Sequence, residues 1–255
     1  MKDFPLQDFY GDIHSSYDRV NRIFTFGRDR AWRRKAVLEL LKQKPARVLD
    51  LCTGTGDFVL ETAKRARGDV ELLGFDFSPD MLALAREKYQ EISQQENILP
   101  VTFLEGDAGQ MPFENGRFDA LGITFGIRNL IYENSRANQH LSEIHRVLRP
   151  GGQLVVLESS RPGNPLWGFF NTIYLRFILP YLGGVISGNL KAYQYLATSS
   201  KNYYTLNEMA AILESAGFQL VQSRSLFLGS VMLLVMERND KEIVSLNNAK
   251  EGYKN

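Results

Sequence analysis

The stretch Arg47–Asp57, which reads RVLDLCTGTGD, constrains the fold of this chain more than any other. Its short apolar run is typical of a buried parallel strand, and the run ends abruptly in Thr-Gly-Thr-Gly. Gly54 and Gly56 allow positive φ angles and the close approach of a ligand. In an open α/β sheet, such a turn lies at the carboxyl ends of the strands, where ligands bind. A turn that binds nothing is the alternative.

Strand-like and helix-like segments alternate along the chain, which predicts βαβ units and a largely parallel sheet. The apolar patterns place strands at 47–52, 71–77, 101–104, 118–124, 153–158, 218–227 and 230–237. They place helices at 28–43, 57–67, 134–148 and 205–217, with a further helix opening at Ser78-Pro79-Asp80. We expect one domain over residues 1–240, which begins with an N-terminal helical segment at 1–44. A polar, disordered tail is expected at 241–255.

Composition excludes several classes of protein. The net charge of +1 gives no overall field for nucleic acid, and one cysteine excludes an intramolecular disulfide. With three scattered histidines, we expect no metal site. The N-terminus has no signal-peptide pattern, so we expect a cytoplasmic protein.

Two segments leave a membrane role open. Pro165–Ile186 is apolar but is interrupted by Pro180 and a Gly-Gly pair, so we expect a helical lid within an insertion at 161–204, or an interfacial helix, instead of a span. The basic run between Arg19 and Lys35 is either a solvated helix face or a surface for anionic lipid.

The ligand of the glycine turn is either a dinucleotide or S-adenosylmethionine. Val59 occupies the position where a dinucleotide fingerprint requires a third glycine. Asp50 before the turn would repel a pyrophosphate and favour a cation. Asp76 ends the second strand and suits a ribose diol in either ligand, while Asp107-Ala108 can meet an adenine amino group. The predicted helix and hairpin at the end of the chain also fit S-adenosylmethionine better than a dinucleotide, because a dinucleotide fold would add another parallel strand.

Together these residues resemble the class I S-adenosylmethionine-dependent methyltransferases. The resemblance implies a three-layer, Rossmann-like α/β fold with a seven-stranded, mostly parallel sheet, helices on both faces and an antiparallel last strand. It also assigns the cofactor contacts. The methionine part would contact Asp50, Gly54, Thr55 and Gly56. The ribose would contact Asp76, the adenine would contact Asp107 and Ala108, and Thr124 would close the site.

Four further motifs make the chain similar to the ubiquinone/menaquinone biosynthesis C-methyltransferase family, of the demethylmenaquinone methyltransferase type. They are Tyr17-Asp18-x-x-Asn21 with Phe26-Gly27 and Trp32, Phe125-Gly126-Ile127-Arg128-Asn129, the segment 146–152 with Leu157-Glu158-x-Ser160, and Tyr193-x-Tyr195-Leu196 with Ala216-Gly217-Phe218. Asp29 and Val20 depart from this pattern, because the family usually has His and Met there.

The resemblance implies that a ring carbon of a prenylated hydroquinone receives a methyl group. Arg128 would stabilise the phenolate, since arginine keeps its charge, and Asn129 would hydrogen-bond a quinol oxygen. Tyr17 and His14 are candidates to relay the proton. The substrate-binding residues implied are Tyr195, Trp167 and Phe170.

Other functions and partners stay open at this point. A different apolar or phenolic acceptor and a non-catalytic, cofactor-binding scaffold are the competing functions. The acceptor ring is either a naphthoquinol or a benzoquinol, and demethylmenaquinol is favoured. We expect peripheral contact with the inner face of a membrane, no nucleic acid, and either a monomer or a homodimer.

Overall fold

The computed structural model describes residues 22, 25, 27–181 and 203–239. Three predicted features lie wholly or partly outside these residues. They are the tail at 241–255, the part of the segment 1–44 that precedes residue 27 except for residues 22 and 25, and residues 182–202 of the insertion at 161–204.

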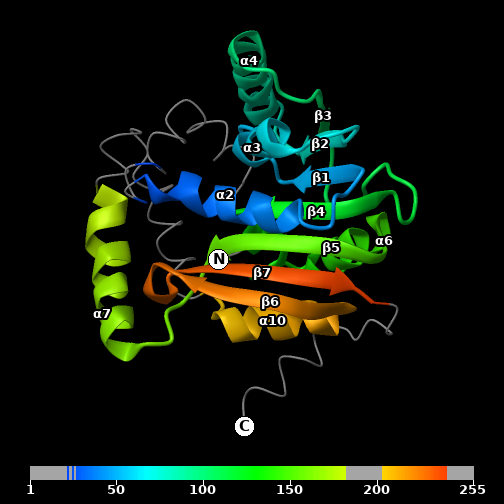
Figure 1. Ribbon diagram of the computed structural model, residues 1–255. Coiled ribbons are helices and arrows are strands. Elements are labelled where there is room, and N and C mark those ends of the chain that lie inside the picture. The colour runs from blue at the N-terminus through cyan, green and yellow to red at the C-terminus, as the bar shows by residue number, and fades with distance from the viewer. Residues whose placement is uncertain (1–21, 23–24, 26, 182–202, 240–255) are drawn as a thin grey trace.

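A seven-stranded sheet forms the middle of the domain, in the order β3-β2-β1-β4-β5-β7-β6 (Figure 1). β1 to β5 pair in parallel, and β7 runs antiparallel to both β5 and β6. The antiparallel last strand is therefore confirmed. The strands are β1 (Arg47–Leu51), β2 (Glu71–Asp76), β3 (Val101–Glu105), β4 (Phe118–Thr124), β5 (Leu148–Ser159), β6 (Phe218–Leu226) and β7 (Val231–Arg238).

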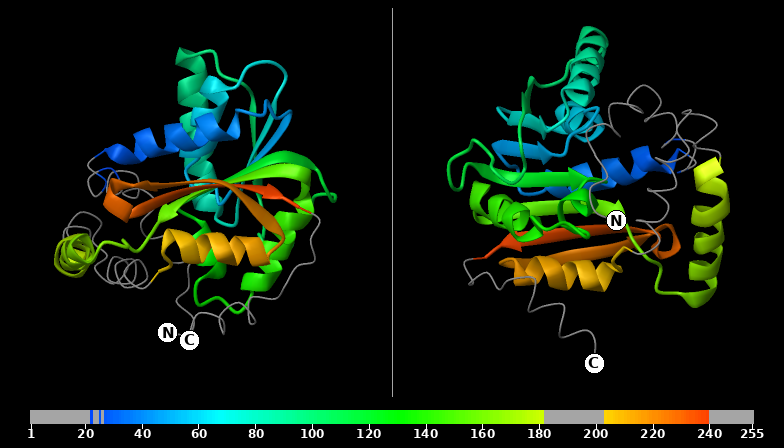
Figure 2. Two further views of the ribbon diagram at one scale, coloured as in Figure 1. Left: turned by 60° about the horizontal axis from the view of Figure 1, so that its bottom comes forward. Right: turned by 180° about the vertical axis from the view of Figure 1, so that it is seen from behind.

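Helices cover both faces of this sheet, which confirms the three layers (Figure 2). The first face packs against α2 (Arg28–Leu40), α3 (Asp57–Arg65) and α4 (Pro79–Gln95). The second face packs against α5 (Ile127–Ile131), α6 (Ala137–Val147) and α10 (Leu206–Ser215). Because both faces are buried, the strands are apolar on both sides. In β1, for example, Val48 packs on the first face and Leu49 on the second.

Several boundaries differ from those that local patterns predict. β5 begins at Leu148 instead of residue 153, because Leu148 pairs with Phe118 of β4 before the chain passes through Pro150-Gly151-Gly152. The preceding helix α6 begins at Ala137 instead of residue 134. The short helix α5, directly after β4, is absent from the predicted elements.

The apolar insertion begins with α7 (Pro165–Ile173), which continues as a π-helical turn, η1 (Tyr174–Ile178). α7 stands beside the end of the sheet where the parallel strands finish (Figure 1). It is attached to the short helix η2 (Phe227–Gly229) and the start of β7 through Trp167. The Trp167 ring packs on Phe227 at 6.0 Å, and its indole N–H donates to the Ser230 hydroxyl at 2.9 Å. The described residues contain no helix with the length and hydropathy of a membrane span.

Candidate functional site

The turn after β1 has the backbone geometry that its glycines predict. Gly54 and Gly56 have φ angles of 53° and 82°, and a side-chain carbon at Gly54 would meet open space. Cys52 also has a positive φ of 57°, which is a strained conformation for a residue with a side chain. Burial raises the pKa of the Cys52 thiol well above its usual range, so the thiol is neutral and unsuited to be a nucleophile. The turn therefore presents backbone to a ligand.

The second strand holds this turn in place. Asp76, at the end of β2, accepts a hydrogen bond from the Gly54 N–H at 2.8 Å and one from the Ser78 N–H at 3.0 Å. Burial raises the pKa of Asp76, and the backbone N–H donors oppose that rise. The carboxylate lies at the cavity wall and keeps acceptor capacity for the hydroxyl groups of a ribose.

The ends of β3 and β4 complete the rim. Asp107 accepts from the Gly109 N–H at 2.8 Å and from Arg136 Nη2 at 2.6 Å. Partial burial works against ionisation of Asp107, but these two donors outweigh it and hold the pKa of the carboxyl below its usual range. Ala108 and Thr124 also line the cavity. The structure thus brings the predicted residues of four successive strand ends together, as parallel strands require.

These strand ends enclose a cavity of about 510 Å³. Its size suits a ligand of several hundred daltons, because small-molecule sites commonly measure about 300–1,000 Å³. Among the residues predicted from the sequence, those that line it are Gly54, Thr55, Asp76, Asp107, Ala108, Thr124 and Asn129.

Asp50 lies beneath the turn instead of on the cavity wall. It is 1% exposed, and its Oδ2 accepts from the Thr53 hydroxyl at 2.6 Å and from the Val59 N–H at 3.1 Å. Its Oδ1 has no hydrogen-bond partner among the described residues. Burial raises the pKa of Asp50 to about 7, with Asp76 adding to the rise and Thr53 and Val59 opposing it. In this structure Asp50 fixes the start of α3. Gly56 likewise serves packing, because a side-chain carbon there would press on Ala85 of α4.

The turn that follows β4 separates its two predicted catalytic residues. Asn129 lines the cavity, whereas Arg128 is 7% exposed and lies behind the wall. The Arg128 N–H donates to Glu158 Oε2 at 3.3 Å. The charge of Arg128 also acts on buried Tyr203, whose pKa is raised by burial and by Glu158 and lowered by Arg128.

Of the residues predicted to bind the acceptor, the described ones, Trp167 and Phe170, do not line the cavity. Trp167 donates to Ser230, just before β7, and Phe170 is 52% exposed on α7 with its ring 5.8 Å from that of Phe169. His14, Tyr17 and Tyr195 lie outside the described residues.

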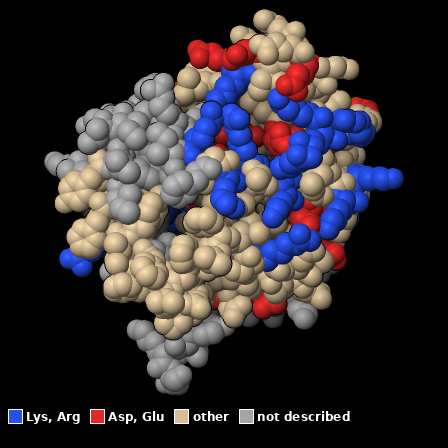
Figure 3. All heavy atoms as spheres, turned by 60° about the vertical axis from the view of Figure 1, so that its left-hand side comes forward, with Lys and Arg blue, Asp and Glu red and all other residues tan. Residues whose placement is uncertain are grey.

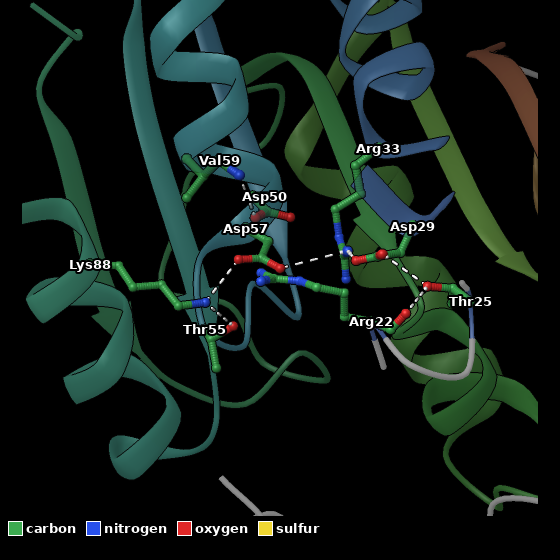
Figure 4. Close-up of polar contacts among 9 residues, drawn as sticks. All are labelled: Arg22, Thr25, Asp29, Arg33, Asp50, Thr55, Asp57, Val59 and Lys88. Carbon is green, nitrogen blue, oxygen red and sulfur yellow. Dashed lines mark hydrogen bonds and ion pairs between the residues drawn. The ribbon is translucent and has the colours of Figure 1, made fainter. Parts of the chain in front are cut away.

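Arg33 is a cavity residue that the sequence interpretation missed. It comes from α2, is 8% exposed, and forms ion pairs with Asp29 at 2.7 Å and Asp57 at 3.6 Å (Figure 4). Its position next to Trp32 on the apolar stripe of the helix, with an acid four residues earlier, was the available signal. His140, Asn134 and Arg136 also line the cavity, and no spacing rule pointed to them.

Two solved structures that share this fold are both named S-adenosylmethionine-dependent methyltransferases. An S-adenosylmethionine-dependent methyltransferase from Thermotoga maritima has a TM-score of 0.61 at 17% identity, covering 91% of this chain and 99% of that one. Another from Aquifex aeolicus has a TM-score of 0.53 at 17% identity, covering 86% and 96%. Strand order, antiparallel β7 and the cavity at the glycine turn define the fold of the class I S-adenosylmethionine-dependent methyltransferases.

Sequence relatives narrow this class to one family. The model described as the ubiE/COQ5 methyltransferase family matches residues 1–236, and the chain belongs to this family. The demethylmenaquinone methyltransferase of Thermus thermophilus is 44% identical over 212 residues, 83% of this chain and 91% of the relative. The ubiquinone/menaquinone biosynthesis C-methyltransferase UbiE of Geobacter sulfurreducens is 36% identical over 236 residues, 92% and 89% of the two chains. This chain is thus an S-adenosylmethionine-dependent methyltransferase.

The described residues fit this cosubstrate. Its ribose requires acceptors, which Asp76 supplies, and its flat adenine suits the rim at Asp107 and Ala108. The open space above Gly54 admits the chain that carries the sulfonium, because no side chain fills it.

Asp50→Asn tests the buried position of that carboxyl. Between about pH 4, near the unfolded pKa, and about pH 7, the folded protein holds a proton on Asp50 that the unfolded chain has lost. The contribution of Asp50 to stability is therefore complete at the acid end and declines as pH rises. We expect the unfolding free energy of wild type minus that of Asp50→Asn to fall across this range in urea titrations. A difference that does not change with pH contradicts the assignment; Asp69→Asn, at an exposed loop position, is the control.

Proposed function

We propose that this methyltransferase transfers a methyl group to a ring carbon of a prenylated hydroquinone, and that demethylmenaquinol is the acceptor. The observation that carries the proposal is its relatives: chains 44% and 40% identical, from Thermus thermophilus and Deinococcus radiodurans, are both named demethylmenaquinone methyltransferase. Relatives at 36% identity carry the name ubiquinone/menaquinone biosynthesis C-methyltransferase, so a benzoquinol is the second candidate.

The acceptor ring needs activation before it can react. A phenol has a pKa of about 10, and its phenolate makes the neighbouring ring carbon much more nucleophilic. S-adenosylmethionine supplies an electrophilic methyl group. The protein has to hold the ring against it, stabilise negative charge on the phenol oxygen and accept a proton.

Asn129 and Arg128 supply the first two of these requirements in our proposal. Asn129 lines the same cavity as Thr124 and donates a hydrogen bond to a quinol oxygen. Arg128 lies behind it, and a buried cation acts strongly across a short distance of low dielectric. Tyr17 and His14 remain the predicted proton relay.

The acceptor is tested by incubating the protein with S-adenosylmethionine and each reduced demethylated quinone in turn. We expect mass spectrometry to find the naphthoquinol with one added methyl group, and less or no methylated benzoquinol. The variant Asp76→Ala, which removes the ribose acceptor, should make no product. If S-adenosylmethionine binds but neither quinol is methylated, the acceptor is a different phenol or apolar molecule. If it binds and no phenolic or apolar acceptor is methylated, the protein is a non-catalytic, cofactor-binding scaffold.

Arg128→Ala tests the catalytic assignment. Loss of one group that stabilises an oxyanion lowers turnover by about 100-fold or more, so we expect a decrease of that size with nearly unchanged affinity for S-adenosylmethionine. Arg128→Lys retains the charge and should recover part of the rate. Unchanged turnover in Arg128→Ala would remove Arg128 from the mechanism, while loss of cosubstrate binding in both variants would indicate a role in folding.

A prenylated acceptor resides in a membrane, and we propose that α7 contacts the inner face of that membrane. Exposed apolar side chains along α7 and η1 include Leu166, Phe169, Phe170 and Phe177, which are 69%, 62%, 52% and 56% exposed. Figure 3 faces this side and shows Lys and Arg side chains gathered beside a surface with few charges. Basic groups next to apolar ones favour anionic lipid.

Liposome co-sedimentation measures this contact. We expect wild type to sediment with anionic vesicles and the double variant Phe169→Asp/Phe170→Asp to remain in solution, because charges there oppose insertion. Val221→Asp, at an exposed apolar position on β6, is the matched control and should sediment like wild type. Equal retention of the double variant contradicts lipid contact. If the double variant changes its oligomeric state instead of its vesicle binding, the surface belongs to a homodimer interface.

A further inference from the structure

Arg33 occupies the cavity wall on the side of α2. Trp32, Val37 and Leu40 lie on the buried side of α2. Their packing directs the Arg33 guanidinium toward the glycine turn. The guanidinium also lies 5.4 Å from the centre of the Phe125 ring, at the end of β4. Arg33 therefore closes the wall between the turn after β1 and the turn after β4.

The guanidinium still has donors to offer. Both of its ion pairs, to Asp29 and to Asp57, use Nη1. Among the described residues, Nη2 and Nε donate to no acceptor. A guanidinium presents its donors as a flat fork that matches the two oxygens of a carboxylate. The free edge of Arg33 is thus suited to one more carboxylate.

Asp57 does not require Arg33 for its charge. Lys88 Nζ donates to Asp57 at 2.8 Å and to the Thr55 hydroxyl at 2.9 Å, whereas the Arg33 pair with Asp57 is longer, at 3.6 Å (Figure 4). Burial works against ionisation of Asp57, but Arg33, Lys88 and Arg22 together lower its pKa. The charge of Asp57 is thus balanced by other cations as well, so it does not require the remaining donors of Arg33.

The order of the strands says which end of the ligand lies near Arg33. Across the sheet edge, β3 carries Asp107, β2 carries Asp76, and β1 carries the glycine turn. A ligand with its adenine at Asp107 and its ribose at Asp76 extends its remaining part toward β1 and β4. For S-adenosylmethionine that part is an amino acid, which ends in an α-carboxylate.

We propose that Arg33 binds the α-carboxylate of S-adenosylmethionine and that Asp29 is its positioning residue, an inference that rests on the proposed use of this cosubstrate. Asp29 is buried and accepts from Arg33 Nη1 at 2.7 Å and from the Thr25 hydroxyl at 2.9 Å. It therefore fixes the rotamer of Arg33. This also gives a purpose to the acid that stands where the family usually has His.

Calorimetry with two ligands tests the assignment. S-adenosylmethionine and its decarboxylated analogue differ only in the carboxylate, so the ratio of their dissociation constants isolates that group. We expect wild type to bind S-adenosylmethionine about 10- to 100-fold more tightly, as for one charge-assisted pair. In Arg33→Met this preference should disappear, because the cosubstrate loses affinity while the analogue binds about as before.

Two further variants separate binding from folding. Arg34→Met removes an exposed arginine from the same helix and should keep the full preference. Asp29→Asn should reduce the preference without abolishing it, which a purely structural role would not do. If Arg33→Met weakens both ligands equally, or keeps the preference, Arg33 is a structural residue only and the proposal is overturned. If wild type binds neither ligand, the proposed function itself has failed.

Discussion

One hydrogen bond between neighbouring strands organises the site: the carboxylate of Asp76 accepts the Gly54 N–H at 2.8 Å. It ties the end of β2 to a turn in which Cys52, Gly54 and Gly56 have positive φ angles, a conformation that is costly for Cys52. Asp50 supports the same turn from below, through the Thr53 hydroxyl and the Val59 N–H. The two carboxylates hold the turn so that Gly54, above which no side chain lies, faces the cavity.

The helix α2 converts this strand edge into a closed wall. Its apolar stripe packs on the first face of the sheet, and the same packing brings Arg33 to the turn. Arg33 then joins three parts of the chain, since it contacts Asp29 on its own helix, Asp57 on α3 and Phe125 after β4. The helix α2 thus contributes Arg33 to the wall of the cavity.

Local sequence was sufficient to predict the residues at the strand ends, because apolar runs locate parallel strands and parallel strands end on one edge. Asp76, Asp107 and Thr124 follow from that rule. The exact start of β5 does not, since it depends on pairing with Phe118 in β4. Arg33 and the burial of Asp50 depend on how α2 and α3 pack on the sheet, and Arg128 and Asn129 are adjacent in sequence but lie on different sides of the cavity wall. Such distinctions arise only in three dimensions.

We infer that the strand ends set the direction in which the cavity holds its ligand. A crystal structure of the protein with S-adenosylhomocysteine, the demethylated product, tests it most directly. We expect the ribose hydroxyls within hydrogen-bonding distance of Asp76, the adenine at Asp107 and Ala108, and the amino-acid part between the glycine turn and Arg33. A ligand bound in the reverse direction, or outside this cavity, would contradict the account.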